Sequence, residues 1–479
     1  MQMLNRTNAA AHRPSQDKIL LFGGGNFIRA FAAWMIDLLN EKTDFNGGIV
    51  VIKPTPGPAY EDLLAQDGLY HVILNGIQDG QLLQDIRLIQ AVTSSIHPYQ
   101  AWEDYLALAE NPTIRYLISN TTEAGIIYDP SNQVTDAPPQ SFPGKLTLWL
   151  YHRFLHFKGD PKKGCIFLPC ELSANNGDDL RHCILQYADQ WQLSADFKDW
   201  LRAHSVFCNT LVDRIVTGFP EDRKAELSQK TGFEDKLMVV GEPYHSWVIQ
   251  GPASLAKELP FHEIGLAVKW VDDLRPYREQ KVKILNGAHT AMVPVGHLAG
   301  KVSVKETIED PLIGRFIEKL LQEEVWPTLD FPETELADFT RKTMDRFRNP
   351  FIFHKLMDIA LNSVSKFKTR LLPTLLEYHE HKGYCPPRIT FALAALIVFY
   401  QGEWNGKSIA LRDDASVLAF FKTAWARNED DLNQLSRLVL GNTSFWGQDL
   451  NEVAGLTALT SQYIQDIREK GIDHSISLL

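Results

Sequence analysis

The chain is long enough for more than one hydrophobic core, since it has 479 residues, of which 44% are hydrophobic and 22% are charged. Its 48 basic and 59 acidic residues give a formal net charge of −11, which argues against a nucleic-acid-binding surface and against a polybasic membrane anchor. The best candidate for an apolar span, residues 391–400, is too short to cross a bilayer and predicts a buried helix. This composition favours an enzyme that acts on a small molecule.

The five cysteines are odd in number and include no CxxC pair, so the sequence indicates neither a disulfide framework nor a zinc cage. They are typical of free thiols in a reducing compartment, and the amino-terminal segment lacks the apolar core of a signal peptide. We therefore expect a cytoplasmic protein. We expect neither nucleic acid nor a membrane as partner, and the sequence by itself does not fix the oligomeric state.

The amino-terminal part predicts a strand, a glycine turn and a helix in immediate succession. Residues 18–22 are apolar, three glycines follow, and apolar residues then recur with helical spacing as far as Leu39. The amides of such a turn, at the positive end of a helix, can bind a pyrophosphate. Ile28 stands where the dinucleotide fingerprint has its third glycine, so an ordinary tight turn stays an alternative. The expected cofactor-binding residues here are Gly23, Gly25, Asn26, Phe27 and Arg29.

Two more apolar segments continue this pattern. Residues 49–52 predict a second strand, and Lys53 stands where an acidic residue usually binds the adenosine ribose, which leaves NAD and NADP both open. Residues 114–118 predict another strand, which ends in the polar turn 119–125 (SNTTEAG). Ligands of such sheets bind outside the carboxyl ends of the strands, so this turn is either a wall of the nicotinamide site or an ordinary polar turn. Its candidate cofactor-binding residues are Asn120, Thr121 and Glu123.

The character of the sequence changes at about residue 271, beyond which helical periodicity dominates to the end of the chain. We therefore predict an α/β protein in which a Rossmann-type nucleotide-binding domain with extensions, residues 1–270, is followed by a mostly α-helical domain, residues 271–479.

The segment 281–289 (KVKILNGAH) places a Lys, an Asn and a His close together in an otherwise apolar stretch. On an α-helix, which turns by about 100° per residue, Lys281, Asn286 and His289 share one face. Gly287 would let a ligand approach the backbone between them. We expect the chemistry here, although each residue taken alone is more typical of a solvated or hydrogen-bonded structural side chain.

Three further side chains are candidates for binding the substrate. Asp213 stands beside Arg214 between apolar residues, and the pair is either structural or leaves Asp213 to bind substrate hydroxyls. The segment 363–373 holds three cations within five residues, among them Lys366 and Arg370. They form either a solvated face or a binding site for a carboxylate-bearing substrate.

In combination, these motifs resemble the long-chain polyol-specific dehydrogenases, the mannitol dehydrogenase family, over nearly the whole chain. The matching segments are 23–30 (GGGNFIRA), 209–215 (NTLVDRI), 242–249 (EPYHSWVI), the 281/286/289 pattern, 346–350 (RFRNP), Lys366 and 446–450 (WGQDL). The resemblance implies a nicotinamide-binding domain, a helical carboxyl-terminal domain and no catalytic metal. It also implies a monomer or a weak homo-oligomer, and the sequence has no coiled-coil pattern that argues otherwise. It also implies that Lys281 is the acid/base, that Asn286 binds the oxyanion, that His289 orients the substrate, and that Asp213 and Lys366 contact the sugar chain.

The chain departs from the polyol-specific pattern at two places. Glu171 and Leu172 replace an Asp-Asn pair, which removes the second oxyanion amide and leaves Asn175 or Asn176 as possible substitutes, and Asp358 replaces an Arg. Both departures favour a branch of the family that acts on sugar acids. Segments 119–125, 169–172 (PCEL) and 284–291 (ILNGAHTA) resemble that branch most.

The resemblance therefore predicts hydride transfer between NAD and a sugar acid, with D-tagaturonate reduced to D-altronate, and it favours NAD over NADP in spite of Lys53. Fructuronate, mannonate and mannitol are alternative substrates. A nicotinamide-binding sensor without turnover is an alternative of another class.

Overall fold

A computed structural model of the protein describes residues 1–122 and 124–479. It divides into two compact units. The first unit comprises Met1–Asn75 and Leu82–Leu274, and the second comprises Gly76–Gln81 and Arg275–Leu479. The short segment 76–81 belongs to the second unit because it contacts helix α15 (Glu333–Phe347): the Asp79 carboxylate pairs with Arg341 at 2.8 Å.

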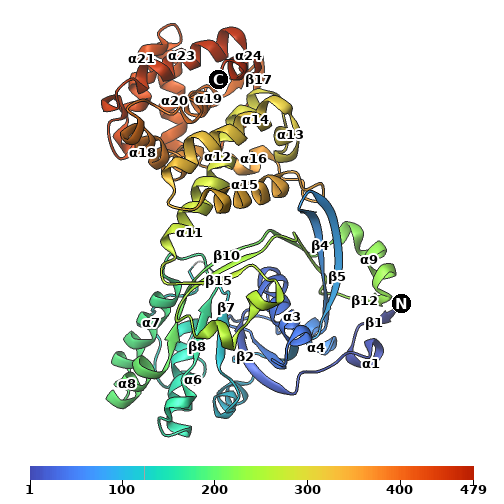
Figure 1. Ribbon diagram of the computed structural model, residues 1–479. Helices are drawn as coiled ribbons and strands as arrows, with labels where there is room; N and C mark the ends of the chain where they lie inside the picture. Colours follow the sequence, from blue (N-terminus) through green and yellow to red (C-terminus); the bar gives the residue numbers. More distant parts are fainter. Residues whose placement is uncertain (123) are drawn as a thin grey trace. The chain divides into compact units, whose positions relative to one another are not determined.

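The first unit is built on a six-stranded sheet in which all neighbouring strands are parallel (Figure 1). The strand order is β6-β3-β2-β7-β8-β9, so the order reverses at β2, which is the topology of dinucleotide-binding sheets. The bounds are β2 (Gln16–Phe22), β3 (Gly47–Ile52), β6 (Val92–Ile96), β7 (Tyr116–Ser119), β8 (Ile166–Pro169) and β9 (Val206–Phe207).

Alternate residues of these strands pack into two different hydrophobic cores. Ile19 and Leu21 belong to one core, whereas Leu20 and Phe22 belong to the other. The sheet is therefore buried on both faces, which explains why its strands read as continuous apolar runs. One face is covered by the helical run that begins with α2 (Asn26–Ile28) and continues through a π-helix (Arg29–Ala33) into α3 (Trp34–Lys42). The other face is covered by α5 (Trp102–Ala107), α6 (Phe142–His156), α7 (Asn176–Gln190) and α8 (Ala195–His204).

Additional strands of the first unit form smaller sheets that the sequence did not indicate. A mixed sheet has the order β11-β13-β4-β5, a second has the order β10-β14-β15, and β1 pairs with β12. The bounds are β1 (Gln2–Met3), β4 (Tyr70–Gln78), β5 (Gln81–Ile89), β10 (Asn209–Asp213), β11 (Val216–Gly218), β12 (Phe233–Glu234), β13 (Val239–Gly241), β14 (Ser246–Gln250) and β15 (Val268–Val271).

The second unit is helical around one large core. At its centre lies α19 (Pro387–Phe399), every residue of which after Pro387 is buried, so the predicted buried helix is confirmed. Helix α19 packs against α12 (Gly287–Leu298) and α23 (Leu456–Lys470). Other helices of this unit are α11 (Arg275–Gln280), α13 (Val304–Glu309), α14 (Pro311–Lys319), α16 (Leu356–Ile359), α17 (Ser363–Arg370), α18 (Leu372–Lys382), α20 (Ala415–Asn428), α21 (Leu432–Leu440), α22 (Thr443–Trp446) and α24 (Ile472–Ser477). Within the described residues, no helix combines the length and apolarity needed to cross a membrane.

Candidate active site

The glycine turn after β2 has the backbone geometry that a dinucleotide-binding turn needs. Gly23 has a φ of +108°, and a Cβ atom there would lie 2.6 Å from the backbone oxygen of Asn120, so only glycine fits. Gly25 precedes the helix with a φ of −67°, and a Cβ atom there would meet nothing within 4 Å. The space in front of the helix N-terminus is therefore open, which fits the approach of a pyrophosphate.

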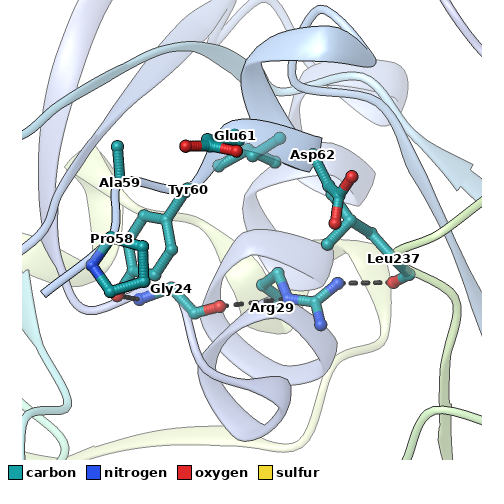
Figure 2. Close-up of a pocket in the computed structure, with 9 residues that line it drawn as sticks. Gly24, Arg29, Pro58, Ala59, Tyr60, Glu61, Asp62 and Leu237 are labelled. Atoms are coloured by element: carbon teal, nitrogen blue, oxygen red, sulfur yellow. Dashed lines mark hydrogen bonds between the residues drawn. The ribbon is translucent and has the colours of Figure 1, made fainter.

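Arg29, an expected cofactor-binding residue, contacts the turn itself (Figure 2). Its guanidinium donates to the backbone oxygen of Gly24 at 3.1 Å, to the Asn26 side chain at 2.7 Å and to the backbone oxygen of Leu237. Burial lowers the pKa of this guanidinium. Arg29 thus stabilises the turn, while Phe27, another expected contact, stacks on Phe31 with ring centroids 4.9 Å apart.

A cavity of about 240 Å³ opens beside the turn, between the segments that follow β2 and β3 (Figure 2). Tyr60 lies at its base, with its hydroxyl accepting a hydrogen bond of 2.9 Å from the Gly24 amide. The carboxylates of Glu61 and Asp62 line the same cavity. Lys53 does not line it, but its ammonium lies 5.3 Å from the centroid of the Tyr60 ring and donates to the Thr55 hydroxyl at 3.0 Å. These carboxylates were not expected from the sequence, because they lie further along the chain than Lys53, which stands where an acidic residue usually binds the ribose.

The polar turn after β7 is held by a buried carboxylate at the end of β8. Glu171 accepts hydrogen bonds from the Ser119 hydroxyl at 2.9 Å, from the Thr121 amide at 2.9 Å and from the Thr121 hydroxyl at 3.0 Å. The Asn120 amide side chain donates to the backbone oxygen of Cys170 at 3.0 Å. The expected residues Asn120 and Thr121 therefore lie at the carboxyl edge of the parallel sheet, while Glu123 lies outside the described residues.

The two asparagines that might replace the missing oxyanion amide differ in how their side chains are used. The fully buried Asn176 side chain donates to the backbone oxygens of Pro169, Glu171 and Thr210 and accepts from the Thr210 amide. All its hydrogen-bonding capacity is used within the fold. Asn175 is exposed and makes no capping bond to helix α7, and Leu172 is 68% exposed. The suggestion that Asn176 replaces the amide is therefore wrong.

Asp213 and Arg214 are both buried where β10 ends. The Arg214 guanidinium donates to the backbone oxygens of Glu242 and Ala30 and lies 4.2 Å from the ring centroid of Trp34. Burial lowers the pKa of Arg214 to about 9. Arg214 is thus a structural side chain of the first unit.

In the second unit, the segment from Lys281 to Asn286 is a π-helix that leads into α12. The rotation of 100° per residue assumed from the sequence does not apply there, because π-helices pair residue i with residue i+5. Lys281 and Asn286 are five residues apart, so the wider turn keeps them on one side. Of the residues 281–289, only Lys281, Val282, Asn286 and His289 are partly exposed, and the others are buried.

Gly287 serves packing rather than ligand access, which corrects the expectation from the sequence. A Cβ atom at Gly287 would lie 3.2 Å from a side-chain carbon of Leu371, at the end of α17. This close approach brings the cations of α17 to α12. The Arg370 guanidinium lies 3.4 Å from the Thr290 hydroxyl, which in turn donates to the backbone oxygen of Asn286 at 2.9 Å.

The two expected substrate-binding cations of α17 are partly withdrawn from solvent. The Lys366 ammonium donates to the backbone oxygen of Ile359 at 2.7 Å. Burial first, and then the positive charges of Arg370 and Arg412, lower the pKa of Lys366, and burial lowers the pKa of Arg370. The charged forms of Lys366 and Arg370 are therefore poorly solvated, and an anionic ligand group nearby would stabilise them.

The His289 ring lies among aromatic side chains that the sequence analysis did not single out. Its centroid is 4.5 Å from that of Phe347, at the end of α15, and 5.3 Å from that of His354, in the loop that follows. Burial lowers the pKa of His354, and the Asp358 carboxylate opposes this. In the sequence, these two residues are marked only by their positions: Phe347 lies within the matching segment 346–350, and His354 follows shortly after it.

Family models and relatives agree on where this chain belongs. The model described as "Mannitol dehydrogenase Rossmann domain" matches residues 17–263, and "Mannitol dehydrogenase C-terminal domain" matches residues 273–468. The altronate oxidoreductase of Yersinia enterocolitica is 48% identical, with 100% of this chain and 99% of the relative covered. That of Bacillus subtilis is 45% identical, with 99% and 98% covered.

Two solved structures share the fold. D-sorbitol dehydrogenase in substrate-free form has a TM-score of 0.80 at 23% identity and covers 99% of this chain and 100% of its own. Pseudomonas fluorescens mannitol 2-dehydrogenase, in a ternary complex with NAD and D-mannitol, has a TM-score of 0.66 at 24% identity and covers 99% of both chains. The sequence matches over both domains and the Rossmann-type sheet lead to one conclusion: the chain belongs to the mannitol dehydrogenase family of oxidoreductases.

Proposed function

We propose that the protein catalyses the reversible, NAD-dependent reduction of D-tagaturonate to D-altronate. The names of the full-length relatives supply the substrate pair. One observation in this chain carries the proposal: the cations of α17 lie close to the segment with the partly exposed Lys281, Asn286 and His289. The contact runs from Arg370 through the Thr290 hydroxyl to the backbone oxygen of Asn286. A proton donor and a hydrogen-bonding amide suit a carbonyl, and the cations suit a carboxylate.

Each residue has a distinct role in this proposal. In the reductive direction, Lys281 donates a proton to the developing alkoxide and Asn286 donates a hydrogen bond to the same oxygen. His289, held by the rings of Phe347 and His354, orients the substrate. Lys366 and Arg370 bind the substrate carboxylate, and Asp213 of the first unit binds a hydroxyl. The bound nicotinamide supplies or accepts the hydride.

Electrostatics of the adenosine side favours NAD over NADP. The carboxylates of Glu61 and Asp62 line the cavity beside the glycine turn, and an acidic side chain in this region binds the ribose hydroxyls of NAD. The Asp62 carboxylate pairs with Lys236 at 3.3 Å, whereas Glu61 would bring a like charge close to a 2′-phosphate. Lys53, the residue that drew attention to NADP, donates to Thr55 and lies 5.3 Å from the centroid of the Tyr60 ring.

The cations of α17 also favour a sugar acid over an uncharged polyol. Fructuronate and mannonate share the carboxylate and remain the nearest competitors, whereas mannitol would leave Lys366 and Arg370 without an anionic partner. A sensor without turnover would need no proton donor beside an amide.

The proposal is tested by mixing purified protein with NADH and a panel of D-tagaturonate, D-fructuronate and D-fructose, and following the loss of NADH absorbance. Fastest turnover of tagaturonate supports the proposal. Faster turnover of fructuronate or fructose reassigns the substrate, and tight NADH binding without turnover of any substrate supports the sensor.

A further inference from the structure

Glu171 is a buried carboxylate at the point where β7 and β8 end. It is 4% exposed, and its three hydrogen-bond donors, from Ser119 and Thr121, are all neutral groups. Burial raises the pKa of this carboxyl, and the hydrogen bonds from Thr121 and Ser119 oppose the rise. The hydrogen bonds favour the ionised form, whereas burial, the larger effect, favours the neutral form, so a positive charge bound nearby would favour ionisation.

In its ionised form, Glu171 has no positive partner in the described part of the first unit. Among residues 1–122 and 124–479, no Lys, Arg or His forms an ion pair with this carboxylate. Burying a charge without a counter-ion is costly, and a neutral side chain of similar size would avoid that cost. A buried, uncompensated charge at the edge of a ligand-binding sheet points to a ligand that supplies the opposite charge.

The strand order indicates which part of a dinucleotide comes nearest to Glu171. The cavity lined by Tyr60 and Glu61 follows β2 and β3, in the half of the sheet that also contains β6. The residues Ser119, Thr121 and Glu171 follow β7 and β8, in the other half. A dinucleotide crosses such a sheet at the point where the strand order reverses, so its two nucleosides lie over opposite halves. An adenosine bound over β3 would place the nicotinamide over β7 and β8.

We propose that Glu171 determines the redox preference of cofactor binding, because its carboxylate stabilises the positive charge of the oxidised nicotinamide ring but gains nothing from the neutral reduced ring. This inference rests on the cofactor in the proposed function, and it does not depend on which sugar acid is the substrate. Loss of hydride from the reduced cofactor creates the positive ring charge, so the same carboxylate favours reduction of the substrate over its reverse on the protein.

The test compares cofactor binding by wild type and Glu171→Gln without substrate. Dissociation constants for NAD⁺, NADH and ADP-ribose are measured by calorimetry, and thermal melts check folding. Because a unit charge a few ångströms away acts strongly in a poorly solvated site, we expect the ratio of the NAD⁺ to the NADH dissociation constant to rise on the order of tenfold. ADP-ribose, which lacks the nicotinamide, should bind Glu171→Gln as it binds wild type.

Two controls separate the charge from the packing. Ser119→Ala removes one hydrogen bond but keeps the carboxyl group, so the ratio should change less than in Glu171→Gln. If Glu171→Gln fails to fold, the exposed neighbour Leu172 offers a second route: Leu172→Lys should raise the ratio, whereas Leu172→Gln should not.

An unchanged ratio in Glu171→Gln, or in Leu172→Lys where only that variant folds, would overturn the inference alone. Wild-type protein that binds neither NAD⁺ nor NADH would overturn the proposed cofactor as well, so the two failures are distinguishable.

Discussion

Substitutions at Gly23 and Gly25 should separate the two tasks of the glycine turn, which are to fold and to bind a pyrophosphate. At Gly25 the φ of −67° suits any residue and a Cβ atom would meet nothing within 4 Å, so Gly25→Ala should change the free energy of unfolding by less than about 1 kcal/mol. The new methyl group faces the space that the pyrophosphate must enter. We expect the dissociation constant of NADH to rise at least about tenfold, which corresponds to about 1.4 kcal/mol.

Gly23→Ala is the matched comparison, because it should fail for a different reason. The φ of +108° costs a non-glycine residue about 1–3 kcal/mol, and the methyl group would lie 2.6 Å from the backbone oxygen of Asn120, which cannot move without disturbing β7. We expect a loss of about 2–4 kcal/mol in urea unfolding followed by circular dichroism, with NADH binding measured by fluorescence on the folded fraction. A stable Gly25→Ala variant that binds NADH like wild type would refute this account of the turn.

Three further substitutions test the remaining roles. Lys281→Ala should lower kcat by roughly 10²–10⁴-fold, the usual contribution of a general acid, while the NADH dissociation constant stays within about twofold of wild type; equal turnover would remove Lys281 from the mechanism. Lys366→Ala should raise KM for tagaturonate more than it lowers kcat, since a carboxylate contact acts in ground and transition states alike, and steady-state kinetics with an unchanged KM would assign Lys366 to a solvated face. Asn176→Ala should cost about 3 kcal/mol in urea unfolding because it removes four hydrogen bonds to buried backbone groups of Pro169, Glu171 and Thr210, whereas Asn175→Ala should cost less than about 0.5 kcal/mol; equal effects of the two would contradict the structural role of Asn176.

Features that depend on neighbouring residues could be predicted from the sequence. The strand at 18–22, its glycine turn and the helix beyond it are encoded by local apolar spacing, and so is the helix that includes residues 391–399. The helical character of 281–289 was also predictable. Its π-helical turn was not, because apolar spacing alone does not distinguish a single π turn from an α-helix.

Features that depend on residues far apart in the chain could not be predicted. The Asn176 side chain donates hydrogen bonds to the backbone oxygens of Pro169 in β8 and Thr210 in β10, so it is not available to a substrate. Nothing near Asn176 in the sequence indicates these bonds. Likewise, the sequence indicates that a ligand could approach the backbone at Gly287, but in the fold the Leu371 side chain occupies this space. The aromatic neighbours of His289 and the carboxylates beside Tyr60 become visible only when their elements are packed together.

The most direct test of the central claim is a single spectrophotometric comparison of NADH and NADPH oxidation with D-tagaturonate as the ketone. The account predicts rapid oxidation of NADH, a kcat/KM at least about tenfold lower with NADPH because of the Glu61 carboxylate, and D-altronate as the product. Equal use of the two cofactors would contradict the assignment of the cavity. No oxidation of NADH by tagaturonate, with turnover of fructose in its place, would contradict the proposed function.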